Sequence, residues 1–110
     1  MGERAVLILV STGARGDAEQ LGEALVVARL AACCNVVPTV ASFYYWEGQL
    51  QRAHEALLLI KTLESKADAV QEFVREHHDA EVPEMIRLPI EGGYSPYLNW
   101  LEKQVTQPRP

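Results

Sequence analysis

A chain of 110 residues has room for one domain with a modest hydrophobic core. Hydrophobic residues make up 48% of it and charged residues 23%, an ordinary globular composition that argues against intrinsic disorder. The formal net charge is −5 and no stretch concentrates lysine or arginine, so we expect no nucleic-acid partner. The apolar run at residues 5–10 is far shorter than the roughly 20 residues of a membrane span and lacks the features of a secretory leader, so we expect no membrane partner.

The first predicted elements are a buried strand and a helix. Residues 5–10 (AVLILV) form a continuous apolar run of the kind found in a strand covered on both faces. We expect a helix over residues 17–32, with Asp17 as its N-cap and Gln20 completing a capping box. Its apolar residues recur at helical spacing: Leu21, Ala24, Leu25, Ala28 and Ala32.

A long hairpin follows. Residues 36–46 are mostly β-branched or aromatic, which favours a strand, and Glu47-Gly48 is a turn signal. The return strand is predicted over residues 51–62.

The rest of the chain predicts a helix, a strand and a short closing helix. Ser65 is expected to open the second helix, whose inner side would carry Ala67, Val70, Phe73, Val74 and His77. The last strand is predicted over residues 85–90. Ser95-Pro96 marks the start of the closing helix, with the serine as cap.

The order β-α-β-β-α-β-α predicts an α+β fold, a ferredoxin-like βαββαβ sandwich with an added C-terminal helix. In that arrangement the first and third strands are central and the second and fourth are edges. Pro38 and Pro89 fall in the two predicted edge strands, where a residue that cannot donate to the ladder is tolerated. We expect one domain over residues 1–110, with a frayed tail from about residue 106.

In the two predicted central strands, the side chains on both faces are apolar. One set of alternating side chains is Val6, Ile8, Val10, Ala56, Leu58 and Ile60; the other is Leu7, Leu9, Leu57 and Leu59. The helices of this fold cover only one face of the sheet, so one of the two sets would lie on the uncovered face. We therefore expect that face to be buried against other copies of the chain. The alternative is that the third helix folds under the sheet and covers this set alone.

Cysteines and histidines are the candidate chemical residues. Cys33 and Cys34 are adjacent, which is neither a disulfide framework nor a C-x-x-C motif, so we expect reduced thiols and a cytoplasmic location. His77 and His78 could bind a divalent metal such as Cu²⁺ or Zn²⁺, with Cys33 as a further candidate ligand. The alternatives are structural: a packed His77, a His78 at the helix C-terminus, and a buried Cys33. An enzyme pairing Cys33 with a histidine is the least supported hypothesis.

Several motifs in one register resemble the CutA family of divalent-cation-tolerance proteins. They are Leu30-Ala31-Ala32-Cys33, Asn35, Pro38, Tyr45-Trp46-Glu47-Gly48, Ile60-Lys61-Thr62, His77-His78, Glu81-Val82-Pro83-Glu84, Leu88-Pro89-Ile90, Tyr97-Leu98 and Trp100-Leu101. The resemblance implies a ferredoxin-like homotrimer similar in architecture to PII signalling proteins, a role in tolerance of or response to copper and other divalent metals, no organic cofactor and no enzymatic reaction.

The chain departs from the family pattern at three positions. Asp79 and Ala80 stand where a Pro-Tyr pair is usual, and Val10 stands where some members carry a cysteine proposed as a copper ligand. A soft thiolate ligand is therefore missing at that position.

The resemblance also suggests a ligand cleft between subunits. Its lining would be Tyr45, Trp46, Glu47, Lys61, Tyr97 and Trp100. Aromatic residues at a hairpin tip are typical of subunit contacts, which is the leading interpretation of Tyr45 and Trp46. By analogy with PII proteins, the alternative function is a signalling module that binds a small effector in these clefts.

Overall fold

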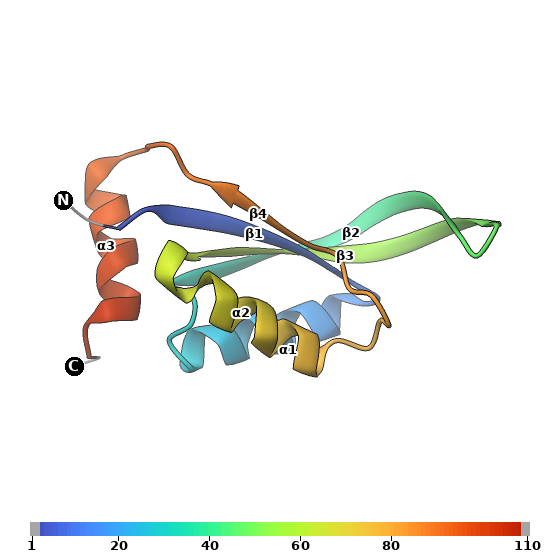
Figure 1. Cartoon of the computed structure of the whole chain (residues 1–110), viewed down its shortest axis with the longest axis horizontal. Coiled ribbons are helices and arrows are strands. Elements are labelled where there is room, and N and C mark those ends of the chain that lie inside the picture. The colour runs from blue at the N-terminus through green and yellow to red at the C-terminus, as the bar shows by residue number, and fades with distance from the viewer. Residues whose placement is uncertain (1–2, 109–110) are drawn as a thin grey trace.

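The computed structural model describes residues 3–108 and has the α+β architecture expected from the sequence (Figure 1). Its elements, in chain order, are β1 (Ala5–Thr12), α1 (Arg15–Val27), β2 (Cys33–Trp46), β3 (Gln49–Leu63), α2 (Glu64–His77), β4 (Met85–Pro89) and α3 (Ser95–Thr106).

The strands form one antiparallel sheet in the order β2-β3-β1-β4, which confirms the predicted central and edge strands. Val6 of β1 pairs with Thr62 of β3 on one side and with Pro89 of β4 on the other. The second strand proline, Pro38, lies where the β2–β3 register shifts between Val37 and Val40. Both prolines therefore occupy edge strands, and Pro38 also falls at a bulge.

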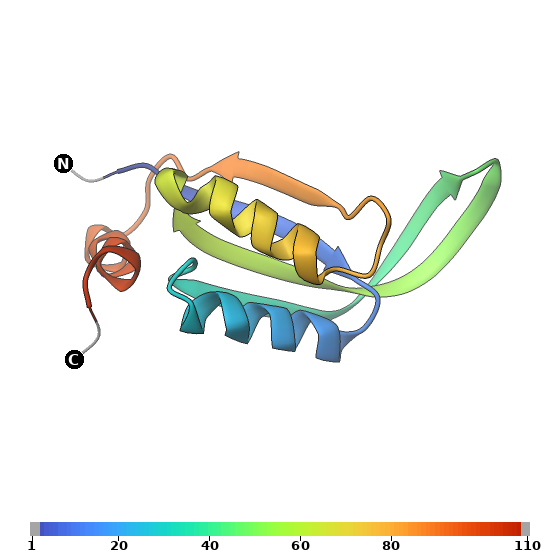
Figure 2. The ribbon, with the colours of Figure 1, turned by 60° about the horizontal axis from the view of Figure 1, so that its bottom comes forward.

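Helices α1 and α2 lie side by side across one face of the sheet, called here the helix face (Figure 2). The predicted first set of alternating residues points into this layer and is fully or almost fully buried, with Leu58 and Ile60 at 0% exposure. Gly22 of α1 allows the close approach, because a Cβ built there would lie 3.0 Å from Leu58 Cδ1 and 3.1 Å from Cys34 Cβ. This layer is the main hydrophobic core.

The opposite face of the sheet, called here the free face, is covered only at one end. Helix α3 stands beyond the end of the sheet (Figures 1 and 2). A second cluster joins its Leu101 and Val105 to Ala5 and Leu63, which pair across β1 and β3. The third helix therefore buries the end row of the free face, whereas Leu7, Leu9, Leu57 and Leu59 remain half-buried.

The β2–β3 hairpin extends well past the rest of the sheet (Figure 1). The two strands pair as far as Trp46 and Gln49, and the turn places Glu47 and Gly48 at φ values of 51° and 78°. Gly48 suits this left-handed backbone because it has no Cβ. The longest dimension of the molecule is 48 Å, compared with 26 and 22 Å for the others.

The predicted start and end of the first helix were wrong. Ala14, not Asp17, is at the N-cap, and it makes no side-chain capping bond. The helix ends at Val27 because Arg29 adopts a φ of 62° and the amides of Arg29 and Leu30 donate to the carbonyls of Val26 and Leu25. These bonds form a Schellman-type end with arginine in the usual glycine position.

The other helix starts also differ slightly from the predictions. Helix α2 begins at Glu64, with Leu63 at the N-cap, and α3 begins at Ser95, with Tyr94 at the N-cap. Helix α3 ends at Thr106, where the predicted tail begins, and the Gln107 carbonyl accepts a hydrogen bond from Arg29. Residues 109–110 lie outside the described residues.

Candidate functional site

The predicted histidine pair borders a cavity of about 260 Å³ between α1, α2 and the end of β1. The cavity is lined by Thr12, Gly13, Asp17, Gln20, Leu21, Ala24, Phe73, His77, His78 and Asp79. Apolar side chains from both helices contribute to the lining beside two carboxylates. The cavity is therefore a small concave site with a mixed polar and apolar wall.

His78 is held by hydrogen bonds at both ring nitrogens. The Ala80 amide donates to Nδ1 at 3.0 Å, so Nδ1 carries the lone pair and Nε2 carries the proton. That Nε2–H donates to the Ser11 carbonyl at 2.6 Å. His78 thus ties the segment after α2 to the end of β1 and has no free lone pair for a metal.

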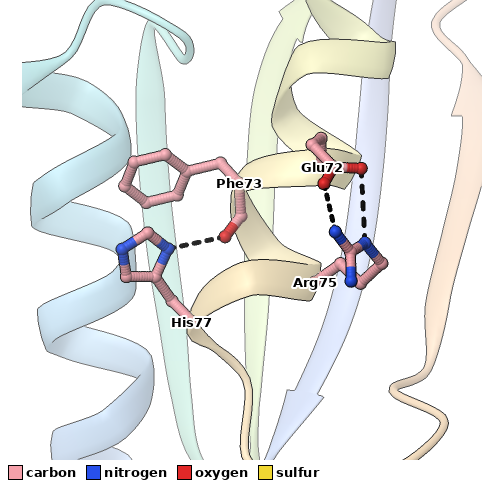
Figure 3. Close-up of polar contacts among 4 residues, drawn as sticks. All are labelled: Glu72, Phe73, Arg75 and His77. Atoms are coloured by element: carbon pink, nitrogen blue, oxygen red, sulfur yellow. Dashed lines mark hydrogen bonds and ion pairs between the residues drawn. The ribbon is translucent and has the colours of Figure 1, made fainter.

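His77 has one ring nitrogen available. Its Nδ1–H donates to the Phe73 carbonyl at 2.7 Å, and its ring stacks on the Phe73 ring with 4.2 Å between centroids (Figure 3). In the neutral ring Nε2 keeps its lone pair. The predicted inward packing of His77 was wrong, because the residue is exposed. The same turn of α2 carries the Glu72–Arg75 ion pair (Figure 3).

The cavity offers few candidate metal ligands. Among the described residues, no group of three His, Cys, Asp or Glu side chains lies close enough to enclose a metal ion. His77 offers one imidazole nitrogen, and Asp17 and Asp79 line the same cavity. Val10, at the position of the family's cysteine, is fully buried in the main core and contributes packing only.

The two cysteines lie on opposite faces of the sheet, and both belong to β2, which begins before the strand predicted over residues 36–46. Cys33 pairs with Lys61 on the free face, and Cys34 pairs with Ile60 on the helix face. Burial under α1 raises the pKa of the Cys34 thiol to about 12, with a smaller contribution from Cys33. The structure therefore does not bring Cys33 together with His77 and His78, either as metal ligands or as a nucleophile–base pair.

The six predicted cleft residues separate into two groups within one chain. Lys61 Nζ lies 3.4 Å from Tyr97 Oη, and the Tyr97 and Trp100 rings stack at 5.5 Å between centroids. The other three residues, Tyr45, Trp46 and Glu47, lie at the tip of the hairpin, which is at the opposite end of the molecule from α3 (Figure 1). Only a second copy could bring the two groups together.

Some cavity residues were missed by the sequence analysis. Phe73 was assigned to the core, and Gln20 only to a capping box. The carbonyl of Ser11 is a backbone group with no side-chain signature. Phe73 and His77 were predicted on one side of the second helix, and their i, i+4 spacing was the signal that the two rings could stack.

The fold and these sites define a ferredoxin-like α+β protein with a histidine-lined cavity and an incompletely covered sheet face. A family model described as CutA1 divalent ion tolerance protein matches residues 6–104. The chain belongs to this family, as the sequence motifs indicated.

Individual relatives agree with this assignment. The chain is 40% identical to chloroplastic Protein CutA 1 of Oryza sativa over 94% of its own length and 58% of the relative's. It is 49% identical to the CutA homolog of Xenopus laevis over 76% of its length and 56% of that protein's. The crystal structure of CutA1 from Oryza sativa superposes with a TM-score of 0.92 at 39% identity, covering 96% of this chain and 97% of that one. The chain thus spans little more than half the length of these two curated relatives.

The helices of residues 3–108 include none that is long and apolar enough to cross a membrane. Two relatives are named as chloroplastic, so the predicted cytoplasmic location stays a prediction.

Proposed function

We propose that this chain acts as a homotrimer in the tolerance of, or response to, divalent metal ions, and binds Cu²⁺ or Zn²⁺ weakly at the cavity between α1 and α2. The observation that carries the metal proposal is the free Nε2 of His77, in a cavity that Asp17 and Asp79 also line. The family's description as divalent ion tolerance proteins supports the biological role.

The free face supports self-association. Leu7, Leu9, Leu57 and Leu59 are half-buried there, and Ile86 and Leu88 of β4 continue the apolar surface at 46% and 42% exposure. Complete burial of a leucine side chain contributes about 1.5–3 kcal/mol. A surface of this kind favours an interface, and the number of three subunits rests on the resemblance to the family.

The cavity supports weak rather than tight metal binding. His77 contributes a neutral imidazole, the ligand type suited to copper and zinc. Asp17 and Asp79 line the same cavity and would contribute negative charge, while the described residues hold no group of three His, Cys, Asp or Glu side chains close enough to enclose the ion. Since His78 is fully hydrogen-bonded and Cys33 lies on the other face, solvent would complete the coordination.

Calorimetric titration with Cu²⁺ and with Zn²⁺ tests the metal proposal. We expect His77→Ala to weaken binding by about tenfold or more, the scale of loss seen when a metal's ligand environment is disturbed. His54→Ala is the matched control, because His54 is exposed on β3 and distant in the chain from the cavity residues. Equal binding by the wild type and His77→Ala would remove this cavity from the proposal.

A second candidate function is a signalling module that binds a small effector between copies. The specific observation in its favour is the cluster of Lys61, Tyr97 and Trp100 at one end of the free face. Thermal-shift screening separates the two functions, because stabilisation by an organic anion and not by metals would favour the effector.

A further inference from the structure

Lys61 is a cation in an apolar part of the free face. In the sheet it stands directly between Leu7 of β1 and Cys33 of β2, and the next row along the strands joins Leu9 to Leu59. Its Nζ lies 3.4 Å from Tyr97 Oη and 5.7 Å from the centre of the Tyr97 ring. Within residues 3–108, the ion pairs of the chain leave Lys61 without a carboxylate partner.

Helix α3 holds two aromatic rings beside this ammonium group. The Tyr97 and Trp100 rings lie 27° from parallel, and the two residues are 37% and 43% exposed. The opposite side of α3 is fixed, because Leu101 and Val105 are buried against the ends of β1 and β3. The rings therefore form a positioned flat surface next to a positive charge, and not a mobile terminus.

Self-association would make the charge of Lys61 costly. This step rests on the proposed assembly through the free face. An ammonium group removed from water needs a compensating negative charge, and the Tyr97 hydroxyl is neutral. Glu47 cannot supply it within the same chain, since the hairpin tip lies at the far end of the molecule (Figure 1).

We propose that Lys61, Tyr97 and Trp100 form a binding site for a small planar carboxylate. The ammonium group binds the carboxylate, and the flat body of the ligand stacks on the exposed aromatic surface. The same carboxylate chemistry is available from Glu47 of a second copy, so the experiment has to separate a free ligand from a protein side chain.

Benzoate is the probe, with acetate and benzyl alcohol as controls for the missing ring and the missing charge. The chain has two tryptophans, so Trp46→Phe, which keeps an aromatic ring at the hairpin tip, leaves Trp100 as the single tryptophan. Because Trp46 is itself a predicted contact residue, the sedimentation of this variant is compared with that of the wild type. We expect benzoate to change Trp100 fluorescence at concentrations where neither control does. Lys61→Met should weaken benzoate binding about tenfold or more, the scale of a hydrogen bond to a charged group. Lys103→Met, which removes an exposed charge from α3, should leave benzoate binding unchanged.

Sedimentation of the same samples separates this proposal from the proposed assembly. If the protein sediments as a single chain and binds benzoate through Lys61, the binding site is supported and the proposed assembly is rejected. The site would be overturned if the assembled protein shows no change of Trp100 fluorescence with benzoate, or if its Lys61→Met variant binds benzoate equally well. Assembly weakened to the same extent by Glu47→Gln and Lys61→Met would assign the negative charge to the second copy and also overturn it.

Discussion

The two faces of the sheet are built from alternate residues of the same strands, yet they are completed differently. On the helix face, Leu58 and Ile60 of β3 are fully buried under α1 and α2. On the free face, their neighbours Leu57 and Leu59 are half-buried, although they are equally apolar. A strand whose side chains are apolar on both faces therefore indicates that both faces are covered. A single chain covers the helix face with α1 and α2, but it covers only one end of the free face, with α3.

The largest expected difference between the faces comes from neighbouring leucines of β3. Leu58→Ala should lower the free energy of unfolding by about 2–5 kcal/mol at any protein concentration, because it opens a cavity in the main core. Leu59→Ala should mainly weaken assembly, so its melting temperature should fall further as the protein is diluted. Denaturant and thermal unfolding at several concentrations measure both effects. Equal losses without a concentration dependence would show that the faces are energetically alike.

A smaller effect is expected from the close contact between α1 and the sheet. Gly22→Ala places a Cβ against Leu58 and Cys34, and we expect a loss of about 1–3 kcal/mol despite the better helix propensity of alanine. Gly16→Ala on the same helix has nothing within 4 Å of the new Cβ and should gain up to about 1 kcal/mol. Urea unfolding compares the two variants, and a stabilised Gly22→Ala would mean that the helix face is loosely packed.

The smallest expected effect is a pH dependence of the free energy of unfolding that comes from Cys34 on the helix face and not from Cys33 on the free face. The pKa of Cys34 is raised from 9.0 to about 12, so above pH 9 the unfolded chain loses this proton while the folded chain keeps it. The free energy of unfolding should therefore fall as the pH rises from 9 toward 12, by at most about 1.4 kcal/mol per pH unit from this group.

Urea unfolding of the wild type and of each cysteine variant at pH 8, 9 and 10 measures this dependence. Cys34→Ala should lose the fall in the free energy of unfolding above pH 9, whereas Cys33→Ala should retain it. An identical pH dependence in both variants would contradict the burial of Cys34 under α1.

The topology could be predicted because several local signals agree. Pro38 and Pro89 marked the edge strands and Glu47-Gly48 marked the hairpin. The ferredoxin-like order placed the first and third strands at the centre, and both are apolar on both faces. The end of α1 could not be predicted in the same way. Ala28 and Ala32 continue the helical spacing, and the helix stops at a left-handed arginine where glycine would be the usual signal.

The sequence singled out the two histidines that line the cavity, but not their different roles or the rest of the lining. The histidine pair was correctly placed at the end of α2, but the difference between its members depends on the carbonyls of Phe73 and Ser11 and the amide of Ala80. Backbone groups have no residue-type signature, so the sequence could not show that His78 is occupied. Cys33 lies away from the histidines because β2 begins at this residue, and alternate residues of a strand point to opposite faces of the sheet. Cys34 therefore points to the helix face and Cys33 to the free face.

Sedimentation equilibrium of the wild type beside Leu59→Glu tests most directly whether copies of the chain cover the free face together. We predict a wild-type mass of three times the 12.3 kDa chain at micromolar concentration. The Leu59→Glu variant should sediment as a single chain and keep the circular dichroism of a folded protein, because its charge points away from the main core. A wild type that sediments as a 12.3 kDa species would contradict the account.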